Sequence, residues 1–149
     1  MSDDLVARVR ERTQANRFWR HLGVQVRDAG EGWVRLHVPV HDGLRNAAGA
    51  PVHGGVLSAL VDMAVGGALS TLHEESGGGV GQTTLDLNVS FLAAADGDLT
   101  AEGRILRRGR TVAFGETTIR DASDRVVAVG RATYMILSGR PPRPETART

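Results

Sequence analysis

The residues best suited to chemistry lie in one apolar stretch near the middle of the chain. His53-Gly54-Gly55 opens a run in which Asp62 is the only charged residue as far as Leu72. Apolar side chains fall on every side of this run, which is typical of a helix that is buried all round. A carboxylate in a buried helix is unfavourable unless a partner satisfies it. Asp62 is therefore the first candidate for a functional residue.

Asp62 has the chemistry of a general base or a nucleophile. Partial desolvation raises the pKa of a carboxyl group, and this makes it a better base at neutral pH. The alternative is a structural role, in which Asp62 satisfies a backbone group or an ion pair in the core. Asp62 taken alone is compatible with both a catalytic and a structural role, so the surrounding residues are needed to distinguish the two.

The two glycines at the head of the run are candidates for binding a developing negative charge. The first N–H groups of a helix lack partners and carry the positive end of its dipole. Because glycine has no side chain, Gly54 and Gly55 permit close approach of a substrate carbonyl, as an oxyanion hole requires. Close packing of helix on strand is the alternative use of these glycines. His53 suits either substrate positioning or helix capping.

Composition and absent motifs exclude several classes of function. The 149 residues include 18 basic and 17 acidic ones, a balance that argues against general nucleic-acid binding. No cysteine is present, so thiol chemistry is excluded. There is no P-loop or G-x-S-x-G motif, and His37 and His41 lack the helical setting of a zinc pair. The charged N-terminus has no apolar signal segment, so a cytoplasmic location is expected.

Two kinds of periodicity predict the elements that position these residues. Residues 3–22 predict an amphipathic helix that ends at Gly23, with an apolar stripe of Leu5, Val9, Phe18, Trp19 and Leu22. Period-two alternation predicts strands at 24–26, 33–40, 82–92, 98–107, 111–120 and 125–137. Turn residues at 28–32 predict a hairpin, and short connections predict an antiparallel meander for the last four strands.

The alternation within residues 82–92 also predicts which side chains share a face. It places the apolar residues from Leu85 to Phe91 on one face of the strand. Thr84 and the other polar residues fall on the opposite face.

The predicted organisation is an N-terminal helical segment (1–22), one main domain (23–137) and a disordered tail (138–149). A flexible connection is expected at 74–81. Six strands that bury one face against a single helix form a two-layer α+β domain. A helix that is apolar all round needs more cover than a flat sheet gives. Either the sheet curls around the helix, or a second subunit covers the remainder.

Several motifs together resemble a known family. They are Asn46, His53-Gly54-Gly55, Asp62 nine residues after the histidine, the strand Thr84–Phe91 (TLDLNVSF) and the segment 109–114 (GRTVAF). This combination resembles hotdog-fold acyl-CoA thioesterases of the phenylacetic-acid-degradation (PaaI-like) type, over about residues 15 to 137. The resemblance implies a curved antiparallel sheet wrapped around one long helix. It also implies homodimers, commonly paired into homotetramers.

The resemblance implies hydrolysis of aryl- or medium-chain acyl-CoA to a free acid and coenzyme A. No separate cofactor is implied, because coenzyme A is part of the substrate. Asp62 would be the general base or nucleophile, with Gly54 and Gly55 as the oxyanion hole and His53 beside the thioester. Asn46, seven residues before His53, would orient the carbonyl or the water, and Thr84 (or its neighbour Thr83) would hold the water.

Two alternatives come from other classes. One is hydration or dehydration of an acyl thioester, and the other is non-catalytic binding of acyl-CoA or an acyl carrier. The first usually pairs a histidine with an acid at a different spacing. The second would be expected to lack the helix acid, which is present here.

The remaining predictions concern the rest of the substrate and the second subunit. Arg107, Arg108 and Arg110 surround a turn at Gly109 and suit coenzyme A phosphates, although a solvated hairpin end is the simpler role. Small residues at Ala47, Ala48, Val65 and Gly66 are candidates for an acyl pocket. Asp62 lies about 10 Å along the helix axis from the glycines. One small thioester cannot reach both, so a homodimer is expected to form the site.

Overall fold

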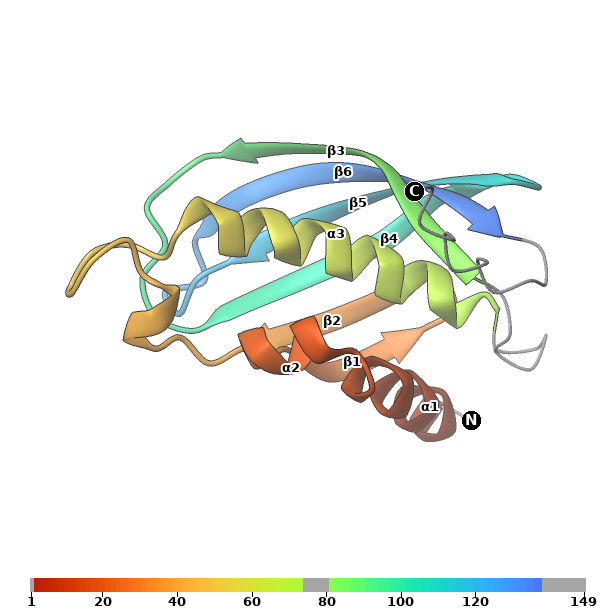
Figure 1. The fold of residues 1–149 in the computed structure, drawn as a ribbon, viewed down its shortest axis with the longest axis horizontal. Coiled ribbons are helices and arrows are strands. Elements are labelled where there is room, and N and C mark those ends of the chain that lie inside the picture. The colour runs from red at the N-terminus through yellow and green to blue at the C-terminus, as the bar shows by residue number, and fades with distance from the viewer. Residues whose placement is uncertain (1, 74–80, 138–149) are drawn as a thin grey trace, which may run out of the picture.

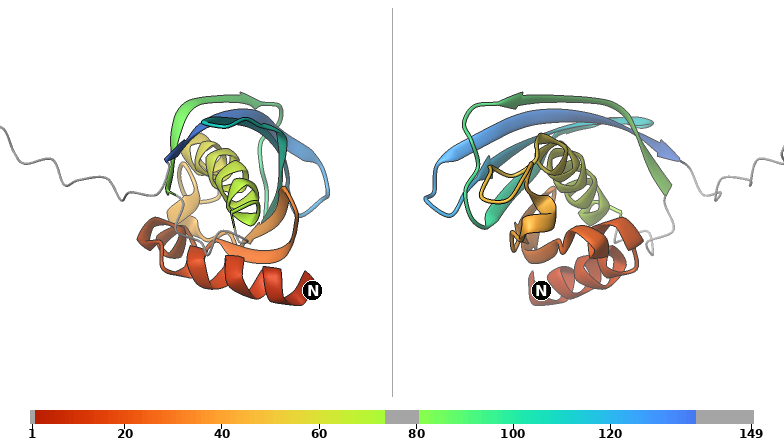
Figure 2. Two further views of the ribbon diagram at one scale, coloured as in Figure 1. Left: turned by 90° about the vertical axis from the view of Figure 1, so that its right-hand side faces the viewer. Right: turned by 60° about the vertical axis from the view of Figure 1, so that its left-hand side comes forward.

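A strongly curved antiparallel sheet wraps around one long helix in the computed structural model, which describes residues 2–73 and 81–137 (Figures 1 and 2). The elements are α1 (Ser2–Gln14), α2 (Arg17–Leu22), β1 (Gln25–Gly30), β2 (Trp33–Val38), the 3-10 turn η1 (Asp42–Leu44), α3 (Gly54–Thr71), β3 (Gly81–Phe91), β4 (Leu99–Arg108), β5 (Val112–Arg120) and β6 (Val126–Leu137). This is the predicted two-layer α+β architecture. The predicted tail at 138–149 and all but the last residue of the connection at 74–81 lie outside the described residues.

Helix α3 is the core of the domain, as its apolar sequence predicts. Every residue from Met63 to Thr71 is buried. By length and composition alone this helix could cross a membrane, but most of it is buried inside the domain. Asp62 differs from its neighbours, because it is half-buried rather than enclosed in the core. The cost expected for a fully buried carboxylate therefore does not arise.

Glycines on the inner face of the sheet let the strands approach α3 closely. A Cβ atom at Gly103 of β4 would lie 2.4 Å from the carbonyl oxygen of Ala64. A Cβ atom at Gly115 of β5 would lie 2.5 Å from Val65 Cγ1. Both distances are shorter than van der Waals contact, so the sheet could not wrap α3 this tightly with side chains at these positions.

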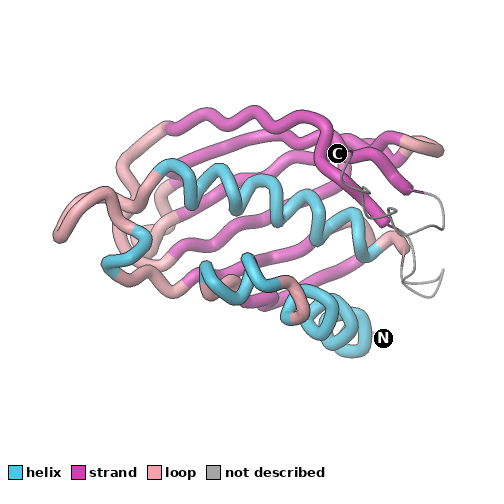
Figure 3. The backbone as a smooth tube through the Cα atoms, in the orientation of Figure 1, coloured by secondary structure: helices cyan, strands magenta, loops and turns pink. Residues whose placement is uncertain are grey.

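The strand order differs from the predicted meander at one strand. Across the sheet the order is β1-β2-β4-β5-β6-β3, and Figure 3 shows the strands side by side along the helix. The strands β4, β5 and β6 form the expected meander, but β3 pairs with β6 and not with β4. Alternation within a strand reports which face is buried and says nothing about its neighbour. After Phe91 the chain therefore crosses past β6 and β5, from the edge strand β3 to the interior strand β4.

A β-bulge in β3 corrects the predicted assignment of faces. The pairing with β6 shifts between Thr84, which lies opposite Tyr134, and Asp86. An extra residue in a strand reverses the alternation beyond it. Thr84 and Leu87 therefore both face α3, although uninterrupted alternation places them on opposite faces.

The first hairpin forms as predicted, but with a shorter turn. Residues 28–30 continue β1 after a bulge, so that Gly30 pairs with Trp33. Only Glu31 and Gly32 remain in the turn. Gly32 has φ +77°, a left-handed conformation that favours glycine.

The N-terminal segment forms two helices where one was predicted. The side chain of Asn16 accepts hydrogen bonds from the N–H groups of Phe18 and Trp19. An N-cap of this kind starts a new helix, so α2 begins at a changed angle. Phe18 is consequently exposed, contrary to the predicted stripe, whereas Trp19 is buried. Gly23 ends α2 as predicted, in the left-handed conformation.

Candidate functional site

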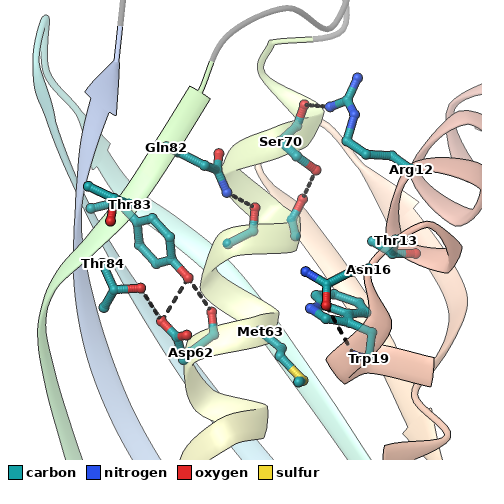
Figure 4. A pocket seen from close by; sticks show the side chains of 13 residues that line it. Arg12, Thr13, Asn16, Trp19, Asp62, Met63, Ser70, Gln82, Thr83 and Thr84 are labelled. Carbon is teal, nitrogen blue, oxygen red and sulfur yellow. Dashed lines mark hydrogen bonds between the residues drawn. The ribbon is translucent and has the colours of Figure 1, made fainter. Parts of the chain in front are cut away.

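A cleft of about 360 Å³ opens beside Asp62, halfway along α3. Its walls come from α3, the start of β3, β6 and the N-terminal helices (Figure 4). The lining residues are Arg12, Thr13, Asn16, Trp19, Asp62, Met63, Gly66, Gly67, Ser70, Gln82, Thr83, Thr84 and Tyr134. We call this the Asp62 cleft. It brings the predicted residues Asp62 and Thr84 together.

Two hydroxyl groups hold the Asp62 carboxylate. Thr84 Oγ1 donates a hydrogen bond of 2.7 Å to Asp62 Oδ1, and Tyr134 Oη donates to the same oxygen over 2.7 Å. The Tyr134 hydroxyl also lies 2.9 Å from the backbone carbonyl oxygen of Asp62, so its single proton is shared. Within residues 2–73 and 81–137, no donor contacts Asp62 Oδ2. One carboxylate oxygen is thus held, and the other is available in the cleft.

The register between β3 and β6 places both hydroxyls. Thr84 and Tyr134 are direct partners across the ladder. Side chains of direct partners on one face lie about 5 Å apart at Cβ, so both can reach one acceptor. The bulge follows immediately after Thr84. It lets this polar residue face the helix while the apolar residues that follow also face inward.

Tyr134 is a site residue that the sequence did not reveal. Burial raises the pKa of its phenol well above the ordinary value; a hydrogen bond with Thr84 opposes this shift, and the charge of Asp62 adds to it. The phenol therefore remains a hydrogen-bond donor at neutral pH. The available signal was a single tyrosine in an alternating strand. Its partner could not be found while β3 was expected beside β4.

Gln82 is a second residue that the sequence did not single out. Its Nε2 donates to the carbonyl oxygen of Gly66 over 2.8 Å, which ties the start of β3 to the middle of α3. Its Oε1 is buried and has no hydrogen-bond partner among the described residues. Gln82 therefore braces the wall of the Asp62 cleft beside Thr84.

The N-terminal helices form the wall of the cleft that faces α3. Thr13 and Asn16 lie near the junction of α1 and α2, and Trp19 lies within α2 (Figure 4). Arg12 donates to the carbonyl oxygen of Ser70 near the end of α3, which ties α1 to this helix. Arg12, Thr13, Asn16 and Trp19 all fall within the amphipathic helix predicted at 3–22. The helical pattern does not indicate which part of the domain the apolar side of that helix covers.

The predicted oxyanion site lies at the N-terminus of α3. His53 caps the helix, because its Nδ1 accepts a 2.7 Å hydrogen bond from the N–H of Gly55. No partner for the N–H of Gly54 is found among the described residues. Gly54 therefore has the available donor, whereas the donor of Gly55 is engaged.

Asn46 lies in the loop that precedes α3. Its backbone N–H and its side-chain amide both donate to the carbonyl oxygen of Pro51, which folds this loop on itself.

The N-terminus of α3 has an apolar cleft of its own, of about 350 Å³. Its lining residues are Val52, Gly54, Leu57, Phe91, Leu92, Ala93, Ala94 and Ala95. The Asp62 cleft shares none of these residues. Within one chain, the structure therefore does not bring Gly54 and Asp62 to one cleft.

The other predicted substrate contacts are spread over the molecule. Of the candidate acyl-pocket residues, Gly66 lines the Asp62 cleft, whereas Val65 is fully buried in the core and Ala47 and Ala48 are exposed. The Val65 prediction is therefore wrong, because its side chain packs between α3 and β5.

The arginine turn lies beyond the other end of α3. Arg107, Arg108 and Arg110 are exposed around the β4–β5 turn, which the N–H of Gly109 closes onto the carbonyl oxygen of Val112. The guanidinium of Arg108 lies 3.4 Å from Nδ1 of His73, just after α3. In the part of the chain that the structure describes, no group of three or more His, Asp or Glu side chains is placed to hold a metal ion.

Comparison with known proteins places this geometry in context. Residues 51–128 match the model of the thioesterase superfamily. A predicted esterase of Halobacterium salinarum is 36% identical over 142 residues, which cover 91% of this chain and 94% of that protein.

Solved structures confirm the predicted hotdog fold. A thioesterase of Haemophilus influenzae superposes with a TM-score of 0.80 at 25% identity, covering 93% of this chain and 94% of that one. The PaaI protein from the phenylacetic acid degradation operon of E. coli superposes with a TM-score of 0.80, covering 93% and 96%. Its identity is 19%, so this second likeness concerns the fold alone.

Proposed function

The chain belongs to the thioesterase superfamily, and from this premise we propose that it hydrolyses acyl-CoA thioesters in the manner of the phenylacetic-acid-degradation type. The observation that carries the proposal is the arrangement at Asp62. One carboxylate oxygen is held by Thr84 and Tyr134, and the other is available in a cleft. A carboxylate held in this way can activate a water molecule with little loss of orientation.

Asp62 acts as the general base in the proposed reaction. Its Oδ2 takes a proton from water while the water oxygen bonds to the thioester carbonyl carbon. The C–S bond then breaks, and coenzyme A leaves as a thiolate, a good leaving group that needs no strong general acid. Direct attack by Asp62, with formation of an anhydride that water then opens, is the alternative chemistry of the same residue.

The N–H of Gly54 stabilises the oxyanion that forms during this attack. It lies at the positive end of the α3 dipole and has no partner among the described residues. His53 and Asn46 both precede Gly54 in the chain, and they would position the thioester. Because Gly54 and Asp62 open onto different clefts in one chain, the proposed site takes Gly54 from a partner subunit.

Strand β3 is the surface that would bring the two subunits together. It is an edge strand of 11 residues, and Leu85, Leu87 and Phe91 on it are 52%, 40% and 55% exposed. A long edge strand with exposed apolar side chains is a template for pairing with another chain. A two-fold pairing of β3 with its copy gives a homodimer with a continuous sheet.

Such antiparallel pairing would also bring the two clefts together. Thr84 lies in the first half of β3, beside Asp62, and Phe91 ends β3 beside Gly54. When two copies of β3 run antiparallel, the Thr84 part of one strand lies beside the Phe91 part of the other. The Asp62 cleft of one subunit would then adjoin the Gly54 cleft of its partner. A further pairing of dimers into a homotetramer is part of the proposal.

The Asp62 cleft would receive the acyl group, and the exposed arginine turn would bind coenzyme A phosphates. A volume of about 360 Å³ is at the lower end of the usual range for small-molecule pockets. Its walls combine Trp19 and Met63 with several hydroxyl and amide groups. Aryl and medium-chain acyl groups both fit this description. The proposed setting is the cytoplasm.

The proposal is tested by incubating the purified chain with a series of aliphatic and aryl acyl-CoA esters and measuring thiol release. We expect hydrolysis, and we expect Asp62→Asn to lower kcat by at least about 100-fold. Asparagine keeps the size of the side chain and an oxygen that can accept from Thr84 and Tyr134. The melting temperature should therefore stay close to that of the wild type.

Two outcomes would reject parts of this proposal. Tight binding of acyl-CoA without thiol release would favour the non-catalytic binding protein. Turnover retained in Asp62→Asn, at more than about a tenth of the wild-type rate, would remove Asp62 from the role of general base.

A further inference from the structure

We propose that Tyr134 is a positioning residue for the Asp62 carboxylate, and that residue 66 is glycine in order to admit the Tyr134 hydroxyl. This inference rests on the proposed function of Asp62. Its evidence lies in the contacts of Tyr134, the space around Gly66 and the register of two strands. None of the motifs that resemble the thioesterase family includes Tyr134.

The Tyr134 hydroxyl contacts both ends of the Asp62 residue. It lies 2.7 Å from Oδ1 of the side chain and 2.9 Å from the backbone carbonyl oxygen. A contact that joins a side chain to its own backbone restricts rotation about the bonds between them. Thr84 donates to the same Oδ1 from the neighbouring strand. Together the two hydroxyls leave the carboxylate little freedom to turn, and they leave Oδ2 for the reacting water.

The space that Tyr134 occupies exists because residue 66 has no side chain. Gly66 follows Asp62 by one helical turn, so both residues lie on the same face of α3. A Cβ atom at Gly66 would lie 2.6 Å from Tyr134 Oη and 3.1 Å from Cζ of the same ring. It would also lie 3.3 Å from Nε2 of Gln82. Glycine destabilises the interior of a helix. The need for space for the Tyr134 hydroxyl gives a reason for glycine at position 66.

Residue 67 offers a matched comparison, because it is also a glycine within α3. A Cβ atom at Gly67 would meet Val34 at 3.3 Å and Trp19 at 3.5 Å, and no atom of Tyr134 is among its nearest neighbours. Alanine at 66 should therefore displace the phenol, whereas alanine at 67 should crowd the packing against β2 and α2. The two substitutions add the same methyl group to the same helix.

The first test is Tyr134→Phe, which keeps the ring and removes the hydroxyl. Hydrogen bonds to charged groups are strong enough that we expect kcat for acyl-CoA hydrolysis to fall roughly tenfold to hundredfold. The KM should stay within about twofold, because the hydroxyl orients the base and does not bind substrate. Wild-type kcat in Tyr134→Phe would overturn the proposal.

The second test is a double-mutant cycle that separates positioning from a packing role. Gly66→Ala should lower kcat in the wild type and add little in the Tyr134→Phe background, because the hydroxyl it displaces is already absent. Gly67→Ala should change kcat by the same factor in both backgrounds. The proposal would be overturned if the effects of Tyr134→Phe and Gly66→Ala on kcat were simply additive. It would also be overturned if Tyr134→Phe were coupled equally to Gly66→Ala and to Gly67→Ala, because the phenol would then only pack.

A spectroscopic test remains valid if no acyl-CoA is hydrolysed. The chain has a single tyrosine, so ring-labelled protein gives one ¹³Cζ resonance at neutral pH. Asp62→Asn replaces the charged acceptor by a neutral one and should shift this resonance, while Gly66→Ala should shift it through loss of the contact. Failure of the wild type to turn over would reject the proposed function alone. An unchanged resonance in both variants would reject the role of Tyr134.

Discussion

At the level of single residues, the two carboxylate oxygens of Asp62 have different surroundings. Oδ1 accepts from two hydroxyls on neighbouring strands, and Oδ2 has no donor among the described residues. A side chain on a helix would otherwise change rotamer freely on the half-buried surface. The hydroxyls of Thr84 and Tyr134 restrict the Asp62 carboxylate to one orientation. A fixed orientation favours proton transfer to a base.

Gly54 permits a prediction about a single N–H group. Gly54 is the first residue of α3, where proline is tolerated because that N–H has no partner within the helix. His53, with φ −60° and ψ 134°, already has a conformation suited to a residue before proline. Gly54→Pro should therefore leave the helix folded and lower kcat by about 100-fold or more, the usual effect of losing an oxyanion donor.

The matched control is Gly54→Ala, which keeps the N–H and adds a Cβ at the same position. This Cβ would lie 3.2 Å from Phe91 Cε1, so some loss from crowding is expected. The loss in Gly54→Pro should be much larger than that in Gly54→Ala. Similar kcat values for the two variants would show that the Gly54 N–H does not stabilise the oxyanion.

At the level of elements, the crossover between β3 and β4 decides where the edge of the sheet lies. The turn between β5 and β6 is tied to this crossover by Asp121, whose side chain is 1% exposed. Its carboxylate accepts hydrogen bonds from the N–H groups of Asp96, Ser123 and Arg125, and from the Arg125 guanidinium. A single buried carboxylate thus connects two loops at one end of the sheet.

This connection predicts a pH dependence of stability. Desolvation raises the pKa of the Asp121 carboxyl, but the backbone N–H groups and Arg125 outweigh it, so the pKa is lowered from 3.8. The unfolded chain then binds this proton more readily than the folded chain does. The stabilisation is complete above about pH 4 and is lost as the pH falls through the lowered pKa.

Asp121→Asn tests this expectation through thermal unfolding at a series of pH values. At neutral pH the variant should melt several degrees below the wild type, because an amide nitrogen cannot accept a hydrogen bond. The difference should shrink as the pH falls below 4. Glu11→Gln, which removes an exposed carboxylate on α1, should melt at the wild-type temperature at every pH. A difference for Asp121→Asn that is constant with pH would contradict the prediction.

At the level of the whole molecule, the separation of the two clefts is the reason for proposing a site built from two chains. One cleft holds Asp62 and Thr84, the other holds Gly54 and Phe91, and they share no lining residue. The exposed apolar edge of β3 runs past both. The proposed site, shared between subunits, would make dimerisation a condition of activity and not only of stability.

Complementation between inactive variants tests this shared site. In a mixed dimer of Asp62→Asn and Gly54→Pro, one site carries both substitutions and the other carries neither. Equal mixing after reversible dissociation should restore about a quarter of the wild-type sites, because half of the dimers are mixed and each has one intact site. Light scattering should confirm that dimers have re-formed. Dimers without recovered activity would place the whole site within one chain.

Local sequence was sufficient for most of the elements, and it singled out Asp62 as the first candidate for a functional residue. A run that is apolar all round predicts a buried helix wherever it occurs, and Asp62, with His53-Gly54-Gly55 before it, stands out within that run. Alternation likewise predicts strands, because burial of one face acts on every second residue. These patterns depend only on residues within a few positions of one another, so they can be interpreted without knowledge of the rest of the fold.

Tertiary structure decided which of these elements meet. The position of β3 beside β6, the bulge after Thr84 and the contact of Tyr134 with Asp62 all depend on pairing between residues far apart in the chain. Such pairing is set by closure of the sheet around α3, and no local pattern records it. The N-cap at Asn16 was not predicted, and only the structure showed that the break between α1 and α2 lies at a wall of the Asp62 cleft.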